Sequence, residues 1–344
     1  MDNNSRTEIG ELGEFGLISR MLAGNITSGQ TVTPAGDDAA AFKLNDTKNE
    51  IVISTDMLNE GIHFDLSYMP LAHLGYKAVA VNVSDIAAMN GKPLNIVVGI
   101  GLSNRFSVEA VEELYKGIHA ACQDFKIDLI GGDTTSSASG LILSVTATGE
   151  VSAKQKTLRS GAKVGDILCV TGDLGAAYMG LQVLEREKQV FAANPKMQPK
   201  LEGYEYLVQR QLKPSARMDI IHELNELTIL PTAMIDVSDG LGSEILHLSK
   251  NSNVGFRIYE ENVPVDALTY NTAVEFGIDP VTAMLNGGED YELLFTINQK
   301  DKELVEKMPD VHMIGYVHEL SKGNELITKH KNAVPLKAQG FQHF

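Results

Sequence analysis

The sequence predicts an α/β protein built from two domains. Segments typical of strands and segments typical of helices alternate through both halves of the chain. At 344 residues the chain is also longer than most single hydrophobic cores. A polar, glycine-bearing stretch at residues 152–166 lies between the two halves. We therefore expect an N-terminal domain over residues 1–154 and a C-terminal domain over residues 155–344.

The first predicted elements of the N-terminal half are a strand, a helix and a second strand. Residues 50–56 form a short run rich in β-branched side chains, and this run ends in a polar turn. Residues 71–93 carry a helical pattern that the Asn-Gly-Lys-Pro sequence at their end stops. Residues 94–102 are mostly apolar, as in a buried strand.

A second helix is predicted after residue 107, with Ser107 as its N-cap. Its apolar face recurs at helical spacing, at Val111, Tyr115, Ile118 and Cys122. Residues 127–133 predict a strand followed by a glycine turn, and residues 140–151 predict another strand.

The C-terminal half continues the alternation. Residues 166–172 predict a strand that leads into a helix. Residues 231–238 predict a strand that runs into an amphipathic helix at residues 239–250. Residues 286–297 predict a glycine turn and then a strand, and residues 313–317 predict a short late strand.

The charge balance limits the partners of this protein. With 29 basic and 45 acidic residues the net charge is −16, so nucleic acid and anionic membrane surfaces would be repelled. No apolar run approaches the roughly 18–20 residues of a membrane span, and residues 1–15 lack the pattern of a signal peptide. Cys122 and Cys169 have neither CxxC nor zinc spacing. We therefore expect free buried thiols and a cytoplasmic protein.

Acidic residues recur where predicted strands end or where glycine marks a turn. They are Asp37, Asp38, Asp56, Asp133, Asp236, Asp239, Glu289 and Asp290. Ligands bind at the strand ends of open α/β sheets. Asp85 differs, because on its predicted helix it continues the apolar stripe of Leu74, Ala78 and Val81. Its carboxylate is therefore expected to face inward, where a charge needs a partner.

Carboxylates that converge on one cleft suit Mg²⁺, which prefers hard oxygen ligands and leaves other positions to water and phosphate. Several such ions would let an acidic protein hold ATP, because the metal lies between two anions. Any one of these acids could instead be part of an ordinary turn, and Asp236, Ser238 or Asp239 could simply cap the following helix. Their recurrence on both sides of the domain boundary favours the metal site.

The common nucleotide-binding and kinase motifs, such as G-x-x-x-x-G-K-[ST], G-x-G-x-x-G and H-R-D, do not occur. A different set occurs in order: GEFGLI, GDDAA, ISTDMLNEGIHF, GYKAVAVNVSDIAAMNGKP, LIGGDTT, TLRSGAKVGD, VTGDLG, DVSDGL, NGGEDYELLFT and GFQHF. From about residue 13 to the C-terminus, these motifs resemble the thiamine-monophosphate kinase family. GGDTT and DVSDGL alone would indicate only the wider superfamily, which includes aminoimidazole ribonucleotide synthetase and selenophosphate synthetase.

The resemblance implies an aminoimidazole ribonucleotide synthetase-like fold whose N-terminal domain pairs through its sheet with a second copy in a homodimer. ATP and several Mg²⁺ ions would lie between the domains, with thiamine monophosphate as the substrate. The implied metal ligands are Asp38, Ser54, Thr55, Asp56, Asp85, Asp133, Asp236 and Asp239. The implied nucleotide contacts are Tyr115, Gly132, Asp133, Arg159 and Ser238, and the implied substrate contacts are His63, Glu289 and Phe341.

For four of these residues a structural role is the alternative. Tyr115 could be a core residue on its helix, and His63 could be a structural histidine. Arg159 could lie on the surface, and Phe341 could pack the tail of the chain. No residue is expected to act as a general base, because a phosphate acceptor is already anionic at neutral pH.

Three other functions stay open. Another ATP-dependent synthetase of the superfamily is one, although the reactive N-terminal cysteine of selenophosphate synthetase is missing and the first cysteine is Cys122. A metal-dependent phosphatase is the second, although His63 is the only histidine within the acidic motifs. The third is a nucleotide-binding scaffold without activity, which the intact acidic residues in every motif argue against.

Overall fold

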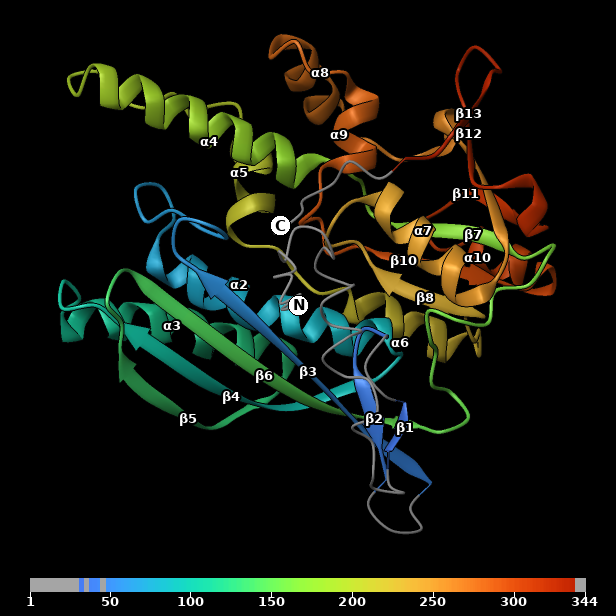
Figure 1. Ribbon diagram of the computed structural model, residues 1–344, viewed down its shortest axis with the longest axis horizontal. Coiled ribbons are helices and arrows are strands. Elements are labelled where there is room, and N and C mark those ends of the chain that lie inside the picture. The colour runs from blue at the N-terminus through green and yellow to red at the C-terminus, as the bar shows by residue number, and fades with distance from the viewer. Residues whose placement is uncertain (1–30, 34–36, 44–47, 338–344) are drawn as a thin grey trace, which may run out of the picture.

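The computed structural model describes residues 31–33, 37–43 and 48–337. In these residues the chain forms two sheets, each in its own α/β layer, with helix α2 (Leu71–Ala88) between them (Figure 1). The predicted two-layer α/β class is confirmed. The last strand of the first sheet ends at Ser152 and the next strand begins at Ile167. The boundary at residues 154 and 155 falls in this connection and stays a prediction.

The first sheet has six strands and is mostly antiparallel. In spatial order they are β1 (Thr31–Thr33), β2 (Ala40–Phe42), β3 (Asn49–Asn59), β6 (Leu141–Ser152), β4 (Lys92–Leu102) and β5 (Asp128–Ser136). Only β4 and β5 run parallel. In β6 the residues alternate strictly between buried and half-buried, as expected when one face of a sheet is covered.

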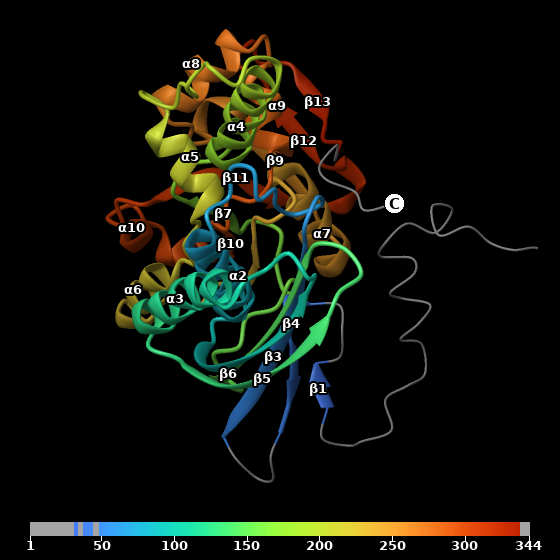
Figure 2. The same ribbon diagram turned by 90° about the vertical axis from the view of Figure 1, so that its left-hand side faces the viewer.

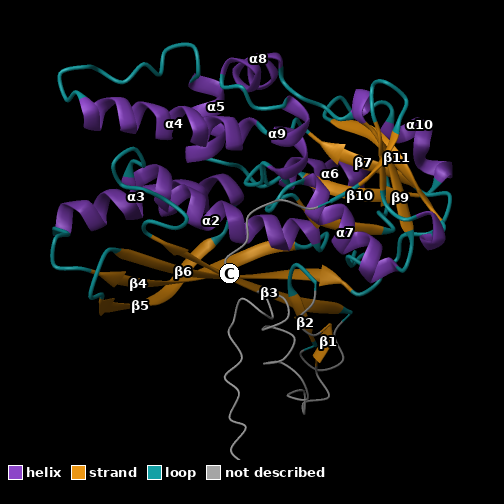
Figure 3. Cartoon of the chain, turned by 45° about the horizontal axis from the view of Figure 1, so that its top comes forward, coloured by secondary structure: helices purple, strands orange, loops and turns teal. Residues whose placement is uncertain are grey.

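Helices cover one face of this sheet. Figure 3 shows α2 and α3 (Val108–Phe125) on one side, and no described helix on the other. The two helices pack closely, because a Cβ on Gly117 would lie 1.8 Å from the carbonyl oxygen of Ala72. Helix α3 begins as predicted, since the Ser107 side chain accepts a hydrogen bond from the Ala110 N–H.

The second sheet has seven strands. In spatial order they are β13 (Ala333–Pro335), β12 (Glu325–Ile327), β9 (Gly255–Tyr259), β11 (Val311–His318), β7 (Ile167–Thr171), β10 (Leu293–Ile297) and β8 (Ala233–Asp236). Its helices are α4 (Ala176–Ala193), α5 (Glu205–Leu212), α6 (Met218–Glu226), α7 (Leu241–Ser252), α8 (Ala267–Glu275), α9 (Pro280–Asn286) and α10 (Lys302–Val305), with short 3₁₀ turns η1 (Glu260–Asn262), η2 (Gln299–Asp301) and η3 (Leu320–Lys322). Figure 2 shows this layer stacked above the first sheet.

Helix α2 joins the two layers. Fourteen of its 18 residues are buried. It packs on β3, β4, β6 and α3 of the first layer, and on β8, α5 and α6 of the second. Its last residues, Ala87 and Ala88, lie in one apolar cluster with Ile220, Leu224 and Met234. A helix that is buried on all sides is usually apolar on all sides, so a polar residue within it needs a bonding partner or a function.

Two sequence predictions on local structure are wrong. The strand that carries Asp56 does not end there, because β3 pairs with β6 along its full length to Asn59. The expected glycine turn at residues 131–133 is also absent, since β5 continues to Ser136. The register between β4 and β5 shifts at Val97, so the glycines mark a β-bulge inside a strand.

Other expectations on the described residues are confirmed. Cys122 and Cys169 are free and buried. Among the described residues, none of the helices combines the length and the apolar character that a membrane crossing requires.

Candidate metal centre

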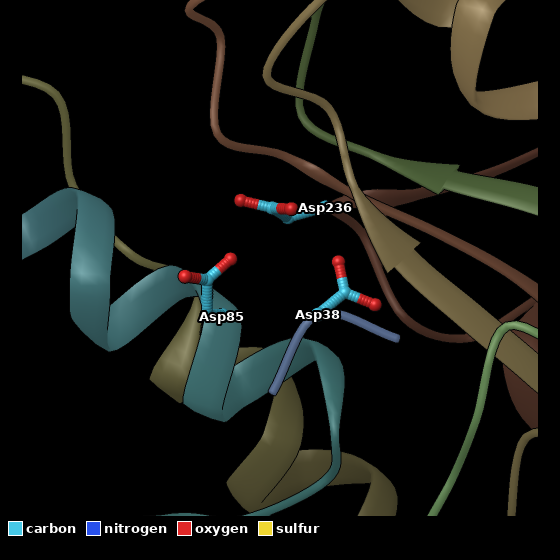
Figure 4. A group of neighbouring side chains, drawn as sticks. All are labelled: Asp38, Asp85 and Asp236. Carbon is cyan, nitrogen blue, oxygen red and sulfur yellow. The ribbon is translucent and has the colours of Figure 1, made fainter. Parts of the chain in front are cut away.

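Three carboxylates from distant parts of the sequence meet between the two layers. Asp38 precedes β2, Asp85 lies on α2 and Asp236 ends β8. One oxygen of each lies within 4.8 Å of the others, and Figure 4 shows the three side chains pointing toward one another. We call this group the cleft carboxylates, and by the cleft we mean these three side chains together with the residues bonded to them. It unites both predicted domains, as the sequence interpretation required.

The electrostatics of this group are those of buried like charges. Burial raises the pKa of Asp85 well above its usual value, and the charges of Asp56, Asp236 and Asp38 raise it further. Burial likewise raises the pKa of Asp236, and the neighbouring Asp38 adds to the rise. Burial raises the pKa of Asp56 to about 6. Without a cation, Asp56, Asp85 and Asp236 therefore ionise at a higher pH than an exposed aspartate does.

Hydroxyl groups orient two of the cleft carboxylates. Ser54 on β3 donates a hydrogen bond to Asp85. Ser84, which is fully buried on α2, donates to Asp236 across the domain boundary at 2.6 Å. Each bond fixes the rotation of a carboxylate and thereby which oxygen faces the group. Ser54 was predicted to lie at this site and does so.

The remaining cleft carboxylate is held by a guanidinium group. Arg159 binds Asp38 through Nε and Nη2, both at 3.0 Å, in a bidentate pair. The backbone N–H of Arg159 also donates to Asp37 at 2.5 Å. Arg159 is therefore part of the cleft and not of the outer surface.

Two further predicted residues border the cleft. Asp56 lies opposite buried Val145, on the helix-covered side of β3. Its backbone N–H donates to Asn82 of α2 at 3.2 Å. Asp239 lies just before α7, where its N–H donates to Glu244 at 2.9 Å. The interpretation of Asp236, Ser238 or Asp239 as the N-cap is wrong, because Gly240 holds that position without a side-chain bond.

Two of the three predicted substrate contacts lie in connections between described elements. Glu289 lies in the turn between α9 and β10, where its N–H donates to the Ser238 carbonyl at 2.6 Å. His63 follows β3, and its Nδ1 accepts from the Asn59 N–H at 3.0 Å. Phe341 and the GEFGLI motif at residues 13–18 lie outside the described residues.

Four predicted residues are not brought to the cleft within one chain. Thr55 and Asp133 are exposed, and the strand registers place them on the face of the first sheet that the helices leave open. Gly132 adjoins Asp133 on the edge strand β5. Tyr115 lines a separate cavity of about 350 Å³ with Phe106 and Val111. Their proposed roles stay predictions.

Sequence reasoning missed three polar residues of α2. Lys77, Asn82 and Ser84 are buried within an otherwise apolar helix. Each needs a partner, because an unpaired buried polar group costs about 1–3 kcal/mol. A signal that could have found two of them is their spacing, because Lys77 and Ser84 are seven residues apart and therefore lie on one face of the helix.

The donor set fits Mg²⁺. Its members are carboxylate and hydroxyl oxygens, which are the hard ligands that this ion prefers. The raised pKa values of Asp85 and Asp236 reflect buried negative charge that a divalent cation would compensate.

The chain is similar to known proteins over most of its length. Residues 36–151 match the family model of the N-terminal domain of AIR synthase related protein, and residues 163–324 match that of its C-terminal domain. The thiamine-monophosphate kinase of Aquifex aeolicus is 34% identical over 97% of this chain and 99% of its own. That of Bacillus subtilis is 32% identical over 96% and 99%.

A solved structure is similar over nearly the whole chain. The structure described as "AaThiL complexed with AMPPCP and TMP" superimposes with a TM-score of 0.82 at 32% identity. The match covers 99% of this chain and all of that one.

Proposed function

The chain belongs to the thiamine-monophosphate kinase family, and from this premise we propose that it transfers the γ-phosphoryl group of ATP to thiamine monophosphate. The products are thiamine diphosphate and ADP. The observation that carries the proposal is the meeting of Asp38, Asp85 and Asp236 from both domains. The similar structure that holds AMPPCP and TMP supports the two substrates.

The difficulty of this reaction is the meeting of two anions. The acceptor phosphate is already negative, so no residue of the chain has to remove a proton from it. Magnesium ions in the cleft would supply the positive charge that lets the two phosphates approach. The chain itself fixes positions, which is the larger part of catalysis in phosphoryl transfer.

Each residue of the cleft has a separate part in this positioning. Asp38, Asp85 and Asp236 would hold the metal ions, together with Ser54, Asp56 and Asp239 beside them. Ser84 keeps Asp236 turned toward the group. Arg159 holds Asp38, and it is also the cation best placed to meet a nucleotide phosphate. Thr55, Gly132, Asp133, Tyr115, Ser238, His63, Glu289 and Phe341 keep the roles that the family resemblance implies.

A homodimer is part of the proposal. Ile53, Met57 and Val97 are 36%, 56% and 38% exposed on the open face of the first sheet. An apolar face of this kind supports pairing with a second copy. Thr55 and Asp133 lie on the same face, so pairing would bring them close to another chain. We assign the protein to the cytoplasm, where ATP and reduced thiols coexist.

One assay tests the proposal. The purified protein is incubated with ATP, Mg²⁺ and thiamine monophosphate, and the products are separated by chromatography. We expect thiamine diphosphate and ADP in equal amounts, and neither in the presence of EDTA. Free phosphate in place of thiamine diphosphate would indicate a phosphatase. No turnover with thiamine monophosphate would reject the kinase.

A further inference from the structure

The most deeply buried charge on α2 is a lysine that the mechanism has not used. The side chain of Lys77 is fully inaccessible. Its Nζ lies 2.9 Å from Oε1 of Glu289 and donates to the backbone carbonyl of Gln211 at 3.3 Å. A buried ammonium group is stable only when it is paired in this way.

The carboxylate of Glu289 is held at both oxygens. Lys77 pairs with Oε1, and the side-chain amide of Gln211 donates to Oε2 at 2.7 Å. The two partners come from α2 and α5, on opposite sides of the domain boundary. Glu289 itself remains 31% exposed, so the pair is sealed on the lysine side and accessible on the carboxylate side.

The backbone around Glu289 is constrained as well. Glu289 and Tyr291 have left-handed φ angles of 58° and 52°, which are uncommon outside glycine. Hydrogen bonds from their N–H groups to Ser238 and Val237 hold them there. Gly288 is required beside them, because a Cβ would lie 2.7 Å from the Ser238 carbonyl. Strained backbone of this kind gathers at functional sites.

Helix α2 contacts this region at two points along one face. Lys77 and Ser84 are seven residues apart, or about 10 Å along the axis. Lys77 binds Glu289, and Ser84 binds Asp236. Since the turn at Glu289 is bonded to the segment that follows Asp236, both contacts position the same part of the C-terminal layer.

From this geometry we infer that Lys77, assisted by Gln211, is a positioning residue that presents the Glu289 carboxylate to thiamine monophosphate. The inference rests on the proposed function, in which Glu289 contacts that substrate. Burial of the Lys77 ammonium group costs desolvation that an apolar side chain in the same space would avoid, so stability alone does not account for the pair. Lys77 acts through Glu289 and does not touch the reacting atoms.

The test separates acceptor binding from nucleotide binding. In Lys77→Met the side-chain length is kept and the charge is lost. We expect the KM for thiamine monophosphate to rise by about tenfold or more, with the KM for ATP changed less than about twofold. Calorimetric binding of thiamine monophosphate without nucleotide should weaken by a similar factor. Lys116→Met is the matched control, since Lys116 forms an exposed ion pair with Glu113 on α3.

A second variant covers the case in which Lys77→Met does not fold. Gln211→Met removes the amide donor and leaves no buried charge unpaired, and it should raise the KM for thiamine monophosphate by about threefold. Equal increases in both KM values, or no increase in either variant, would overturn the inference. Failure of the wild-type protein to phosphorylate thiamine monophosphate would instead reject the proposed function, which keeps the two results distinct.

Discussion

Two groups of acids in this protein contain equally buried carboxylates in opposite surroundings. The cleft carboxylates Asp38, Asp85 and Asp236 face one another. A second group, which we call the C-terminal ion network, contains Asp290 and Glu292 in the segment between α9 and β10. Asp236, Asp290 and Glu292 are each only 2–3% exposed. Burial alone therefore does not distinguish them.

Their partners do distinguish them. Glu292 is paired with Arg210 at 2.8 Å and with Arg217 at 2.6 Å, and it accepts from Thr171 at 2.5 Å. Asp290 accepts from the N–H groups of Gly175 and Ala177, at the start of α4. Within the described part of the chain, the cation that forms an ion pair with a cleft carboxylate is Arg159, and its partner is Asp38. The network contains its own cations, whereas in the cleft the proposed Mg²⁺ ions would supply most of the positive charge.

The largest effect is expected in the C-terminal ion network. Glu292→Gln keeps the shape of the side chain and removes the charge between two guanidinium groups. Arg210 and Arg217 would lose the buried carboxylate that they share, and would keep only Asp290 at 3.6 Å and the exposed Asp219 and Asp310. The free energy of unfolding should therefore fall by about 3–5 kcal/mol. Urea denaturation measures this change. Glu113→Gln, at an exposed ion pair, is the control and should change it by less than about 1 kcal/mol. Equal values for the two variants would contradict the comparison.

Neutralising a cleft carboxylate is expected to lower activity and to raise the stability of the metal-free protein, whereas neutralising Glu292 lowers stability. Asp236→Asn removes a metal ligand but no volume, so kcat should fall by about 100- to 1,000-fold. The Tm of the metal-free variant should rise, because one of several repelling buried charges is gone. Steady-state kinetics and thermal denaturation with EDTA check the two effects. Glu303→Gln, on the surface of α10, serves as the control. Wild-type turnover in Asp236→Asn would remove the metal assignment.

The smallest expected effect is the change of folding stability with pH in the metal-free protein. Burial raises the folded-state pKa of Asp56 to about 6, above the unfolded value of about 3.9. Burial and neighbouring carboxylates also raise the pKa values of Asp85 and Asp236 above that of an exposed aspartate. A raised carboxyl pKa gives stability that is complete below about pH 4 and is lost as the pH rises through about 6. We expect the metal-free protein to lose stability over that window, and saturating Mg²⁺ to offset the loss.

The C-terminal ion network adds a background to this measurement. Burial raises the pKa of Asp290 to about 7, which acts in the same direction. The difference between Mg²⁺-free and Mg²⁺-saturated protein isolates the cleft, because Asp290 is not one of its members. Binding of Mg²⁺ at pH 6 should also release protons, as calorimetry in buffers of different ionisation enthalpy can measure. Binding without proton release would count against ionisation of the cleft carboxylates on metal binding.

The fold and the centre of the cleft followed from local sequence patterns. The predicted helix at residues 71–93 is α2, and its apolar spacing indicated that Asp85 faces inward. The acids beside glycine turns and at predicted strand ends led to Asp38 and Asp236. These inferences succeeded because periodicity and strand ends are encoded over a few neighbouring residues.

The rest depended on contacts that no local pattern encodes. Glu289, Asp290 and Glu292 lie within four residues, yet Glu289 pairs with Lys77 of α2 and the other two belong to the C-terminal ion network. Only the positions of Lys77, Arg210 and Arg217 separate them. Likewise, the glycines of residues 131–132 signal a turn or a bulge equally well until the pairing of β4 with β5 is known.

The placement of α2 has a consequence for how the chain is made. Its neighbours on one side, α5, α6 and β8, all come from residues 205–236, long after the helix itself. During synthesis the first half of the chain therefore emerges with an apolar helix that lacks part of its covering. Neither half is expected to be an autonomous folding unit, so a chain cut near residue 155 should yield aggregating fragments rather than two separate proteins.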